Sequence, residues 1–169
     1  YMVSMGFGYK LGIDLPGEKR GMIPNAQFYD KAYRGSWNGL TVISIAIGQG
    51  EVTATPLQIA NLGATIANRG YFVTPHVVKE IEGEPMDSVF SEKRYTKVDK
   101  SHYDEVAQGM RMAVLGGTCR TANMPDIEIC GKTGTAQNHG KDHSAFMGFA
   151  PLNNPKIAVA VYVENGGWG

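Results

Sequence analysis

Apolar residues recur at helical spacing in two parts of the chain, and the first of these follows Thr55. Thr55-Pro56-Leu57-Gln58 has the form of a capping box, with threonine at the N-cap and proline at the first helical position. Small and branched apolar residues follow at mostly helical spacing as far as Ala67. Asn68-Arg69-Gly70 then supplies a stop signal, so the pattern predicts a helix that ends there with Gly70 at the C′ position.

The second helical pattern begins at Ser101, and Asp104 is placed to reach back to the same first turn. The glycine pair Gly116-Gly117 ends this pattern and predicts the end of the helix. We expect the buried face of this helix to consist of four apolar residues, namely Val106, Met110, Ala113 and Val114.

Three strands are predicted near the end of the sequence, at Ile127 to Gln137, Ser144 to Ala150 and Ile157 to Glu164. The short turns at Asn138 to His143 and Pro151 to Pro155 make neighbouring strands antiparallel. In the third strand both alternating sets of side chains are apolar, which predicts helices on both faces of the sheet. The predicted fold class is therefore α+β, with an antiparallel sheet of three C-terminal strands covered by helices.

The other segments carry weaker patterns. Tyr1 to Tyr9 resembles the end of a helix, and Lys10 to Leu40 is a Gly- and Pro-containing stretch that we expect to be a long ordered loop with short helical turns. Short extended pieces are predicted at Tyr71 to Thr74 and His76 to Ile81, and Gly83 to Lys100 is polar and rich in turn residues.

Composition narrows the class of protein. The 169 residues carry a formal net charge of zero, which argues against nucleic acid as a partner, because proteins that bind nucleic acid present a basic face. No apolar run is long enough to cross a bilayer, and no signal peptide opens the sequence. The first residue is Tyr1 rather than methionine, and Gly169 follows closely after a predicted strand. We therefore expect the chain to be one part of a longer protein.

The most informative chemical pattern is Lys132-Thr133-Gly134-Thr135-Ala136, which lies in the first predicted strand. It places a cation, two hydroxyls and a glycine along one short edge, which suits a site that binds a carboxylate next to a substrate backbone. Thr133 and Thr135 are two residues apart, so their side chains share one face of the strand and Gly134 faces the other way. Lys-Thr-Gly is one of the motifs of penicillin-binding proteins and β-lactamases, beside Ser-x-x-Lys and a Ser-Asp-Asn element.

Seven blocks, taken in order, resemble the transpeptidase domain of class B penicillin-binding proteins. The blocks are Gly12 to Glu18, Ile47 to Gly50, Thr53 to Ala60, Gly117 to Thr118, Gly131 to Gln137, Ala145 to Pro151 and Glu164 to Gly167. The last block is most similar to the elongation type of that family, penicillin-binding protein 2. The resemblance covers nearly the whole chain and implies that residues 1–169 are the C-terminal part of the transpeptidase domain.

The resemblance also implies a reaction and a place in the cell. The family contains serine-type D-Ala-D-Ala transpeptidases, which cross-link peptidoglycan stem peptides through an acyl-enzyme, and β-lactam antibiotics acylate the same serine. Such a protein acts at the periplasmic face of the bacterial inner membrane, anchored by an N-terminal helix that these residues do not include. Other cell-elongation proteins are its implied partners, and no metal or cofactor is implied.

Four residues take roles from the resemblance. Lys132 would contact the serine of the family's Ser-x-Asn motif and give the cleft a positive potential. Thr133 and Thr135 would donate hydrogen bonds to the substrate carboxylate, and Gly134 would let the substrate backbone approach the strand. The backbone N–H of Thr135 would supply half of an oxyanion hole. Lys132 and Thr135 are thus the candidate catalytic residues, and all four are candidates for substrate binding.

The chain lacks the nucleophile that this resemblance requires, because no Ser-x-x-Lys sequence occurs in it. Ser36-Trp37-Asn38 has the form of the Ser-x-Asn motif but follows the position that the family's motif occupies, so we interpret it as part of a loop. We expect the Ser-x-x-Lys and Ser-x-Asn segments and the C-terminal helix to lie outside these residues, and the 169 residues to be inactive alone.

A hypothesis from another class is a β-lactam-sensing receptor domain, which shares the Lys-Thr-Gly strand but has no turnover. The blocks at Gly12 to Glu18 and Thr53 to Ala60 favour the transpeptidase instead. Among weaker site candidates, Gln137, His143 and Ser144 flank the turn between two predicted strands.

Several other polar residues receive structural interpretations. Gly48-Gln49-Gly50 is interpreted as a tight turn before the capped helix. Asp14 and Glu18 could suggest the carboxylate pair of a glycosidase, but they lie in a Pro-Gly loop without a matching arrangement. Cys119 and Cys130 are interpreted as buried thiols, a disulfide between them stays open, and their spacing does not match a zinc finger or ribbon.

Overall fold

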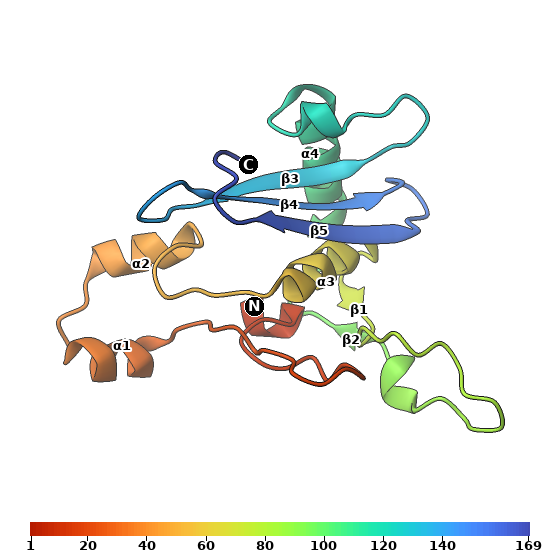
Figure 1. Ribbon diagram of the computed structural model, residues 1–169, viewed down its shortest axis with the longest axis horizontal. Coiled ribbons are helices and arrows are strands. Elements are labelled where there is room, and N and C mark those ends of the chain that lie inside the picture. The colour runs from red at the N-terminus through yellow and green to blue at the C-terminus, as the bar shows by residue number, and fades with distance from the viewer.

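The computed structural model describes residues 1–169, and its helices and sheets confirm the predicted α+β class. The helices are α1 (Ala26–Tyr33), α2 (Gly39–Ala46), α3 (Pro56–Ala67) and α4 (His102–Gly116), with 3-10 turns at η1 (Met2–Met5), η2 (Ser88–Phe90) and η3 (Arg120–Ala122). The strands are β1 (Tyr71–Phe72), β2 (Arg94–Tyr95), β3 (Cys130–Ala136), β4 (His143–Ala150) and β5 (Ile157–Val163). Figure 1 shows the sheet of β3, β4 and β5 packed on α3 and α4, with α1 and α2 to one side.

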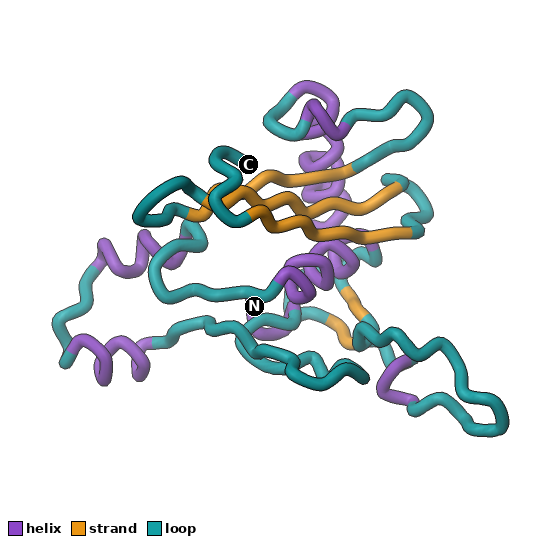
Figure 2. Tube along the Cα trace, in the orientation of Figure 1, coloured by secondary structure: helices purple, strands orange, loops and turns teal.

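The three C-terminal strands form one antiparallel sheet in the order β3-β4-β5, as their short connecting turns predicted (Figure 2). Thr133 pairs with Phe146 and Gly131 with Gly148, and Phe146 pairs in turn with Val161 of β5. The central strand is therefore β4, while β3 and β5 each have one unpaired edge. A separate two-stranded sheet joins β1 to β2.

Helix α3 begins as its sequence predicts. The hydroxyl of Thr55 accepts a hydrogen bond from the N–H of Gln58 at 3.1 Å, and the side-chain oxygen of Gln58 accepts from the N–H of Thr55 at 3.0 Å. Its end differs by one residue from the prediction: Asn68 is the C-cap, and Arg69 takes the left-handed conformation with a φ of 58° before Gly70. The Arg69 side chain donates to carbonyls in the last turn of α3, which stabilises this end without glycine at C′.

Gln58 also joins the N-terminal segment to α3. Its side chain is 1% exposed, and its Nε2 lies within hydrogen-bond distance of the carbonyls of Gly6, Tyr9 and Arg20, at 2.9 to 3.1 Å. Buried amides are costly without partners, so this contact holds the first twenty residues against the start of the helix.

The buried face of α4 is rotated from the predicted one. Its buried residues are Tyr103, Ala107, Met110 and Val114, whereas Val106 is 46% exposed and Ala113 is only half-buried. The observed set follows the helical period from Tyr103, whose aromatic ring the prediction left out. Asp104 does not cap the helix but binds the guanidinium of Arg69 at 2.6 Å.

The hydrophobic core lies between the sheet and the two long helices. It contains Ile66, Ala67, Tyr103, Ala107, Met110, Cys130, Phe149 and Leu152. The prediction that helices cover both faces is wrong for these residues, because α3 and α4 both pack on the face that carries Phe149 and Ala158. Val161 and Val163 of β5 point to the opposite face and are about half exposed, at 51% and 49%.

The segment from Lys10 to Leu40 contains the whole of α1, where only short helical turns were predicted, and α2 begins at its end. Asn25 caps α1 by accepting a hydrogen bond from the N–H of Phe28 at 2.9 Å, and Asn38 caps α2. Both helices have only eight residues, which is too short for a sustained period to stand out in the sequence. The extended pieces predicted after Gly70 shrink to the two residues of β1.

None of the helices combines the length and the hydropathy that crossing a membrane requires.

Gly148 gives a direct test of the sheet packing. A Cβ at this position would lie 2.8 Å from the carbonyl oxygen of Cys130 and 2.9 Å from the ring of Phe146. We predict that Gly148→Ala destabilises the protein by roughly 1–3 kcal/mol, because the backbone of β3 must move. Thermal or denaturant unfolding measures the change.

The matched control is Gly109→Ala in α4, where a Cβ meets no atom within 4 Å. Alanine in a helix interior should raise stability there by about 0.5–1 kcal/mol. Equal stability of the wild-type protein and the Gly148→Ala variant would contradict the described packing of Phe146 on this glycine.

Candidate functional site

The unpaired edge of β3 presents the Lys-Thr-Gly segment. The Nζ of Lys132 donates to the carbonyl of Thr133 at 2.6 Å, and the side-chain amide of Gln49 lies 3.5 Å from the carbonyl of Thr135. Both carbonyls therefore point away from β4. In an antiparallel strand the N–H and C=O of one residue point to the same side, so the N–H of Thr135 also lies on the open edge.

The two threonine hydroxyls share one face of β3, as predicted from their spacing, while Lys132 and Gly134 alternate with them. Thr133 is half-buried, and its hydroxyl donates to the hydroxyl of Thr118 at 3.0 Å. The hydroxyl of Thr135 accepts from the N–H of Gly169 at 3.2 Å. The structure thus brings the four predicted residues together on one short edge.

A groove of about 340 Å³ lies on the same face as the threonine hydroxyls. Its lining comes from η3, from β3 to β5 and from the last residue: Thr121, Ala122, Thr133, Ser144, Ala145, Phe146, Val161, Val163 and Gly169. The groove places apolar surface from β4 and β5 beside the hydroxyl of Thr133.

Gly48-Gln49-Gly50 forms a turn, as predicted, and this turn also contacts β3. Gly48 and Gly50 have φ values of 76° and 68°, which glycine adopts without strain. This turn carries the side chain of Gln49 to the carbonyl of Thr135, 86 positions further along the chain. In the sequence, the two flanking glycines are the only signal that Gln49 occupies a defined position.

Glu51, directly after this turn, is held by two phenols. The hydroxyl of Tyr29 donates to its carboxylate at 2.7 Å, and the hydroxyl of Tyr33 donates to the other carboxylate oxygen. Burial and the hydrogen bond to Glu51 raise the pKa of Tyr29 to about 12, and the hydroxyls of Tyr33 and Tyr29 lower the pKa of Glu51. The pair of phenols therefore ties α1 to the segment that positions Gln49.

Two of the three weaker candidates contact the C-terminal segment, and the third makes no side-chain hydrogen bond. His143 Nδ1 accepts from the N–H of Asn165 at 3.0 Å, and Ser144 donates to the carbonyl of Gly167 at 3.1 Å. Gln137 is exposed and makes no side-chain hydrogen bond. These contacts give His143 and Ser144 structural partners and supply no general base next to a nucleophile.

Ser36-Trp37-Asn38 is used in local structure, which agrees with its interpretation as a loop. Asn38 caps α2, and the indole N–H of Trp37 donates to Asp30 at 2.8 Å. Asp14 accepts from the backbone N–H groups of Val78 and Val77, and these bonds lower the pKa of its carboxyl.

Glu18 accepts from the backbone N–H groups of Leu11, Gly12 and Ile13. The carboxylates of Asp14 and Glu18 thus bind loop backbone and make no glycosidase pair. Cys119 and Cys130 are both buried, as predicted, and they are not joined by a disulfide. Burial raises the pKa of the Cys130 thiol, and no cluster of His, Cys, Asp and Glu side chains could hold a metal ion.

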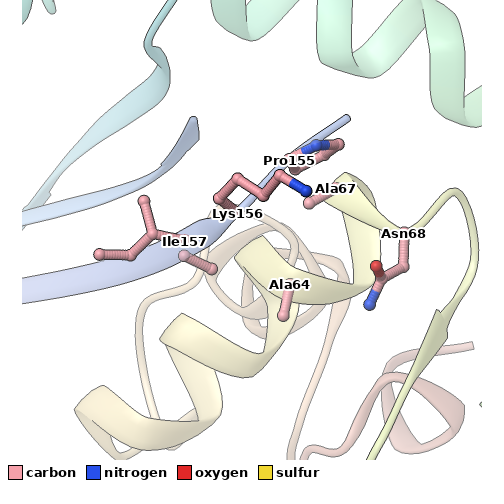
Figure 3. A pocket seen from close by; sticks show the side chains of 7 residues that line it. Ala64, Ala67, Asn68, Pro155, Lys156 and Ile157 are labelled. Carbon is pink, nitrogen blue, oxygen red and sulfur yellow. The ribbon is translucent and has the colours of Figure 1, made fainter. Parts of the chain in front are cut away.

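A smaller pocket of about 160 Å³ lies between the second half of α3 and the start of β5, which is the edge strand opposite β3 (Figure 3). It is lined by small residues of α3, including Ala64 and Ala67, and by Lys156 just before β5. The side chain of Lys156 extends toward Ala67 in the last turn of the helix. No hydroxyl or carboxylate side chain lines this pocket, so it is a weaker candidate than the β3 edge.

Lys-Thr-Gly is a motif of penicillin-binding proteins and β-lactamases, and here it lies on an edge strand of an α+β fold. The profile described as "Penicillin binding protein transpeptidase domain" matches residues 1–169 in full. The chain therefore belongs to the penicillin-binding protein transpeptidase family.

Several of its relatives within that family are named MrdA or PBP2. The chain is 39% identical to the peptidoglycan D,D-transpeptidase MrdA of Acinetobacter baumannii and 30% identical to MrdA of Escherichia coli strain K12, with the whole chain covered in both comparisons. It superposes with a TM-score of 0.88 on PBP2 of Pseudomonas aeruginosa, solved in complex with WCK 5153, at 41% identity over 99% of the chain.

PBP2 of Helicobacter pylori superposes with a TM-score of 0.85, at 30% identity over 99% of the chain. The chain spans only part of each relative: 28% of the Acinetobacter protein, 30% of the Escherichia protein, 37% of the Pseudomonas structure and 31% of the Helicobacter structure.

The support of the Gln49 turn by Glu51 can be tested through pH. Because the tyrosine hydroxyls lower the pKa of Glu51 in the folded protein, its contribution to stability is present above the ordinary carboxyl pKa of 4.5. The contribution is lost as the pH falls through the lowered folded value. We predict that Glu51→Gln lowers the melting temperature at neutral pH and that the difference from the wild-type protein shrinks below about pH 4.5.

Glu82→Gln is the control, since Glu82 is exposed and its side chain makes no hydrogen bond. It should leave the melting temperature unchanged at neutral pH. If the difference between wild-type protein and Glu51→Gln were the same at acid and neutral pH, the ionised carboxylate would not be the group that the tyrosines hold.

Proposed function

We propose that this chain is the C-terminal part of the transpeptidase domain of a PBP2-type peptidoglycan D,D-transpeptidase. The observation that carries the proposal is the open edge of β3, where Lys132, Thr133 and Thr135 lie together. The relatives named as peptidoglycan D,D-transpeptidases support the reaction class.

The first proposed task of this edge is to bind the terminal carboxylate of a stem peptide. The ammonium of Lys132 is exposed and supplies a positive potential beside the strand. The hydroxyls of Thr133 and Thr135 point to one face, where both can donate to the same carboxylate. Hydrogen bonds to an ionised acceptor are shorter and stronger than those between neutral groups, so the carboxylate fixes the orientation of the substrate.

The second proposed task is to stabilise the oxyanion. The N–H of Thr135 lies on the open edge and can donate to the carbonyl oxygen of a substrate that runs along β3. Loss of one such donor costs roughly 3 kcal/mol in the transition state. The contact from Gln49 to the carbonyl of Thr135 helps to hold this peptide unit in place.

The proposed reaction has two acyl transfers. The oxygen of a serine attacks the carbonyl of the penultimate D-alanine, the C–N bond to the terminal D-alanine breaks, and the serine proton leaves on the released amine. An amine of a neighbouring stem peptide then attacks the ester, which forms the cross-link and returns the proton to the serine. We propose that the serine belongs to a Ser-x-x-Lys segment outside these 169 residues, so that this chain is inactive alone.

The same site would react with β-lactams, whose carboxylate and strained amide take the places of the D-Ala-D-Ala carboxylate and peptide bond. The proposed role is enzymatic rather than sensory, because the relatives described above are named as transpeptidases. We propose other cell-elongation proteins as partners, which the complex of PBP2 with MreC from Helicobacter pylori supports. We propose the periplasmic face of the inner membrane as the location, where peptidoglycan is cross-linked.

Lys132→Ala tests the function in the full-length protein that contains this chain. We predict that acylation by benzylpenicillin slows by about 100-fold or more, because the cleft loses its cation, while the melting temperature changes little. Labelling followed over time by intact mass gives the rate.

Lys156→Ala is the matched control, since Lys156 is also exposed but lies by the opposite edge of the sheet. It should acylate at the wild-type rate. A wild-type rate in Lys132→Ala would remove Lys132 from the site, and a wild-type protein that forms no adduct at all would refute the proposed function.

A further inference from the structure

We propose that Thr118 is a positioning residue for carboxylate recognition and that it acts through the hydroxyl of Thr133. The two hydroxyl oxygens are 3.0 Å apart, although the residues are 15 positions apart in the sequence. The inference rests on the proposed function, because it concerns the carboxylate site on β3.

The segment after α4 holds Thr118 in a defined position. A Cβ at Gly117 would lie 2.8 Å from the Cα of Ala113, so only glycine fits this close turn. The N–H groups of Gly117 and Cys119 both donate to the carbonyl of Ala113, at 3.1 and 3.0 Å, and Cys119 is 1% exposed. Thr118 is therefore anchored on both sides, and its side chain points to β3.

The hydroxyl pair can reverse its direction when a carboxylate arrives. A hydroxyl has one proton to donate and two lone pairs that accept. Without ligand, Thr133 donates to Thr118. A carboxylate accepts the Thr133 proton instead, and the proton of Thr118 can then turn to the oxygen of Thr133. This chain of two hydrogen bonds polarises the Thr133 hydroxyl and strengthens its bond to the ligand.

A purely structural role explains this pair poorly. Thr118 is exposed and Thr133 is only half-buried, so water could satisfy either hydroxyl if the other were removed. The bond therefore adds little to folding, and its main effect is to set the rotamer of Thr133. The effect should appear only with ligands that carry the carboxylate.

The test compares benzylpenicillin with its methyl ester as acylating agents of the full-length protein. The ester has the same ring and side chain but no carboxylate charge. For each variant, intact mass gives both second-order rate constants, and the readout is the ratio of the acid rate to the ester rate. We expect Thr118→Val, which keeps the shape but lacks the hydroxyl, to lower this ratio by about 3- to 10-fold.

Two further variants make the comparison specific. Thr118→Ser keeps the hydroxyl and should retain the wild-type ratio. Thr96→Val removes a different hydroxyl pair, between Thr96 and Tyr103 near the start of α4, and should also retain it. Thr118→Ala replaces the valine variant if valine prevents folding, and the same fall in the ratio is expected.

Each outcome decides the question. A lower ratio in Thr118→Val, restored in Thr118→Ser, supports the positioning role. A wild-type ratio in Thr118→Val, or an equal fall of both rates, would overturn it and leave the proposed function intact. A wild-type protein that reacts with neither compound would refute the proposed function itself.

Discussion

The contact of α3 and α4 with one face of the three-stranded sheet fixes the position of β3, the strand that carries the candidate residues. Cys130 and Phe149 are almost completely buried in this contact, together with Ala107 of α4. Burial of a side chain such as that of Phe149 is worth about 1.5–3 kcal/mol, so the start of β3, which packs with it, cannot shift without a cost. The strand then runs out of the core, and Lys132 follows the buried Gly131 as an exposed residue. Because β3 begins in the core and continues into solvent, the site on this strand is both fixed in position and accessible to a ligand.

An edge strand imposes a second constraint, since its outward N–H and C=O groups need partners. Along β3 the outward carbonyls of Thr133 and Thr135 receive the side chains of Lys132 and Gln49. The N–H of Thr135 remains available on the same side, and an extended peptide that lies along a strand uses such groups for recognition. The proposed binding of a stem peptide therefore exploits a property that every edge strand has, and the side chains of the Lys-Thr-Gly segment add the preference for a carboxylate.

Local sequence signals correctly predicted the elements that have clear start and stop residues. The capping box at Thr55 predicted α3, and alternating apolar residues with short turns predicted three antiparallel strands in the observed order. The short helices α1 and α2 were missed because eight residues give too few periods, and the buried face of α4 was misplaced because Tyr103 was not counted in it. The residues of the Lys-Thr-Gly segment were predicted from a known motif. The contacts of Gln49 and Thr118 with β3 were not predicted, because they depend on tertiary packing between distant positions and the sequence has no local pattern for them.

We propose that the edge of β3 binds the carboxylate and the reacting carbonyl of the ligand. The most direct measurement is a crystal structure of the full-length protein acylated by benzylpenicillin. We predict an ester on a serine outside these 169 residues and a carboxylate within hydrogen-bond distance of the Thr133 and Thr135 hydroxyls. The ester carbonyl oxygen should accept a hydrogen bond from the N–H of Thr135. A carboxylate that touches no residue of β3, or an ester on a serine of this chain, would contradict this proposal.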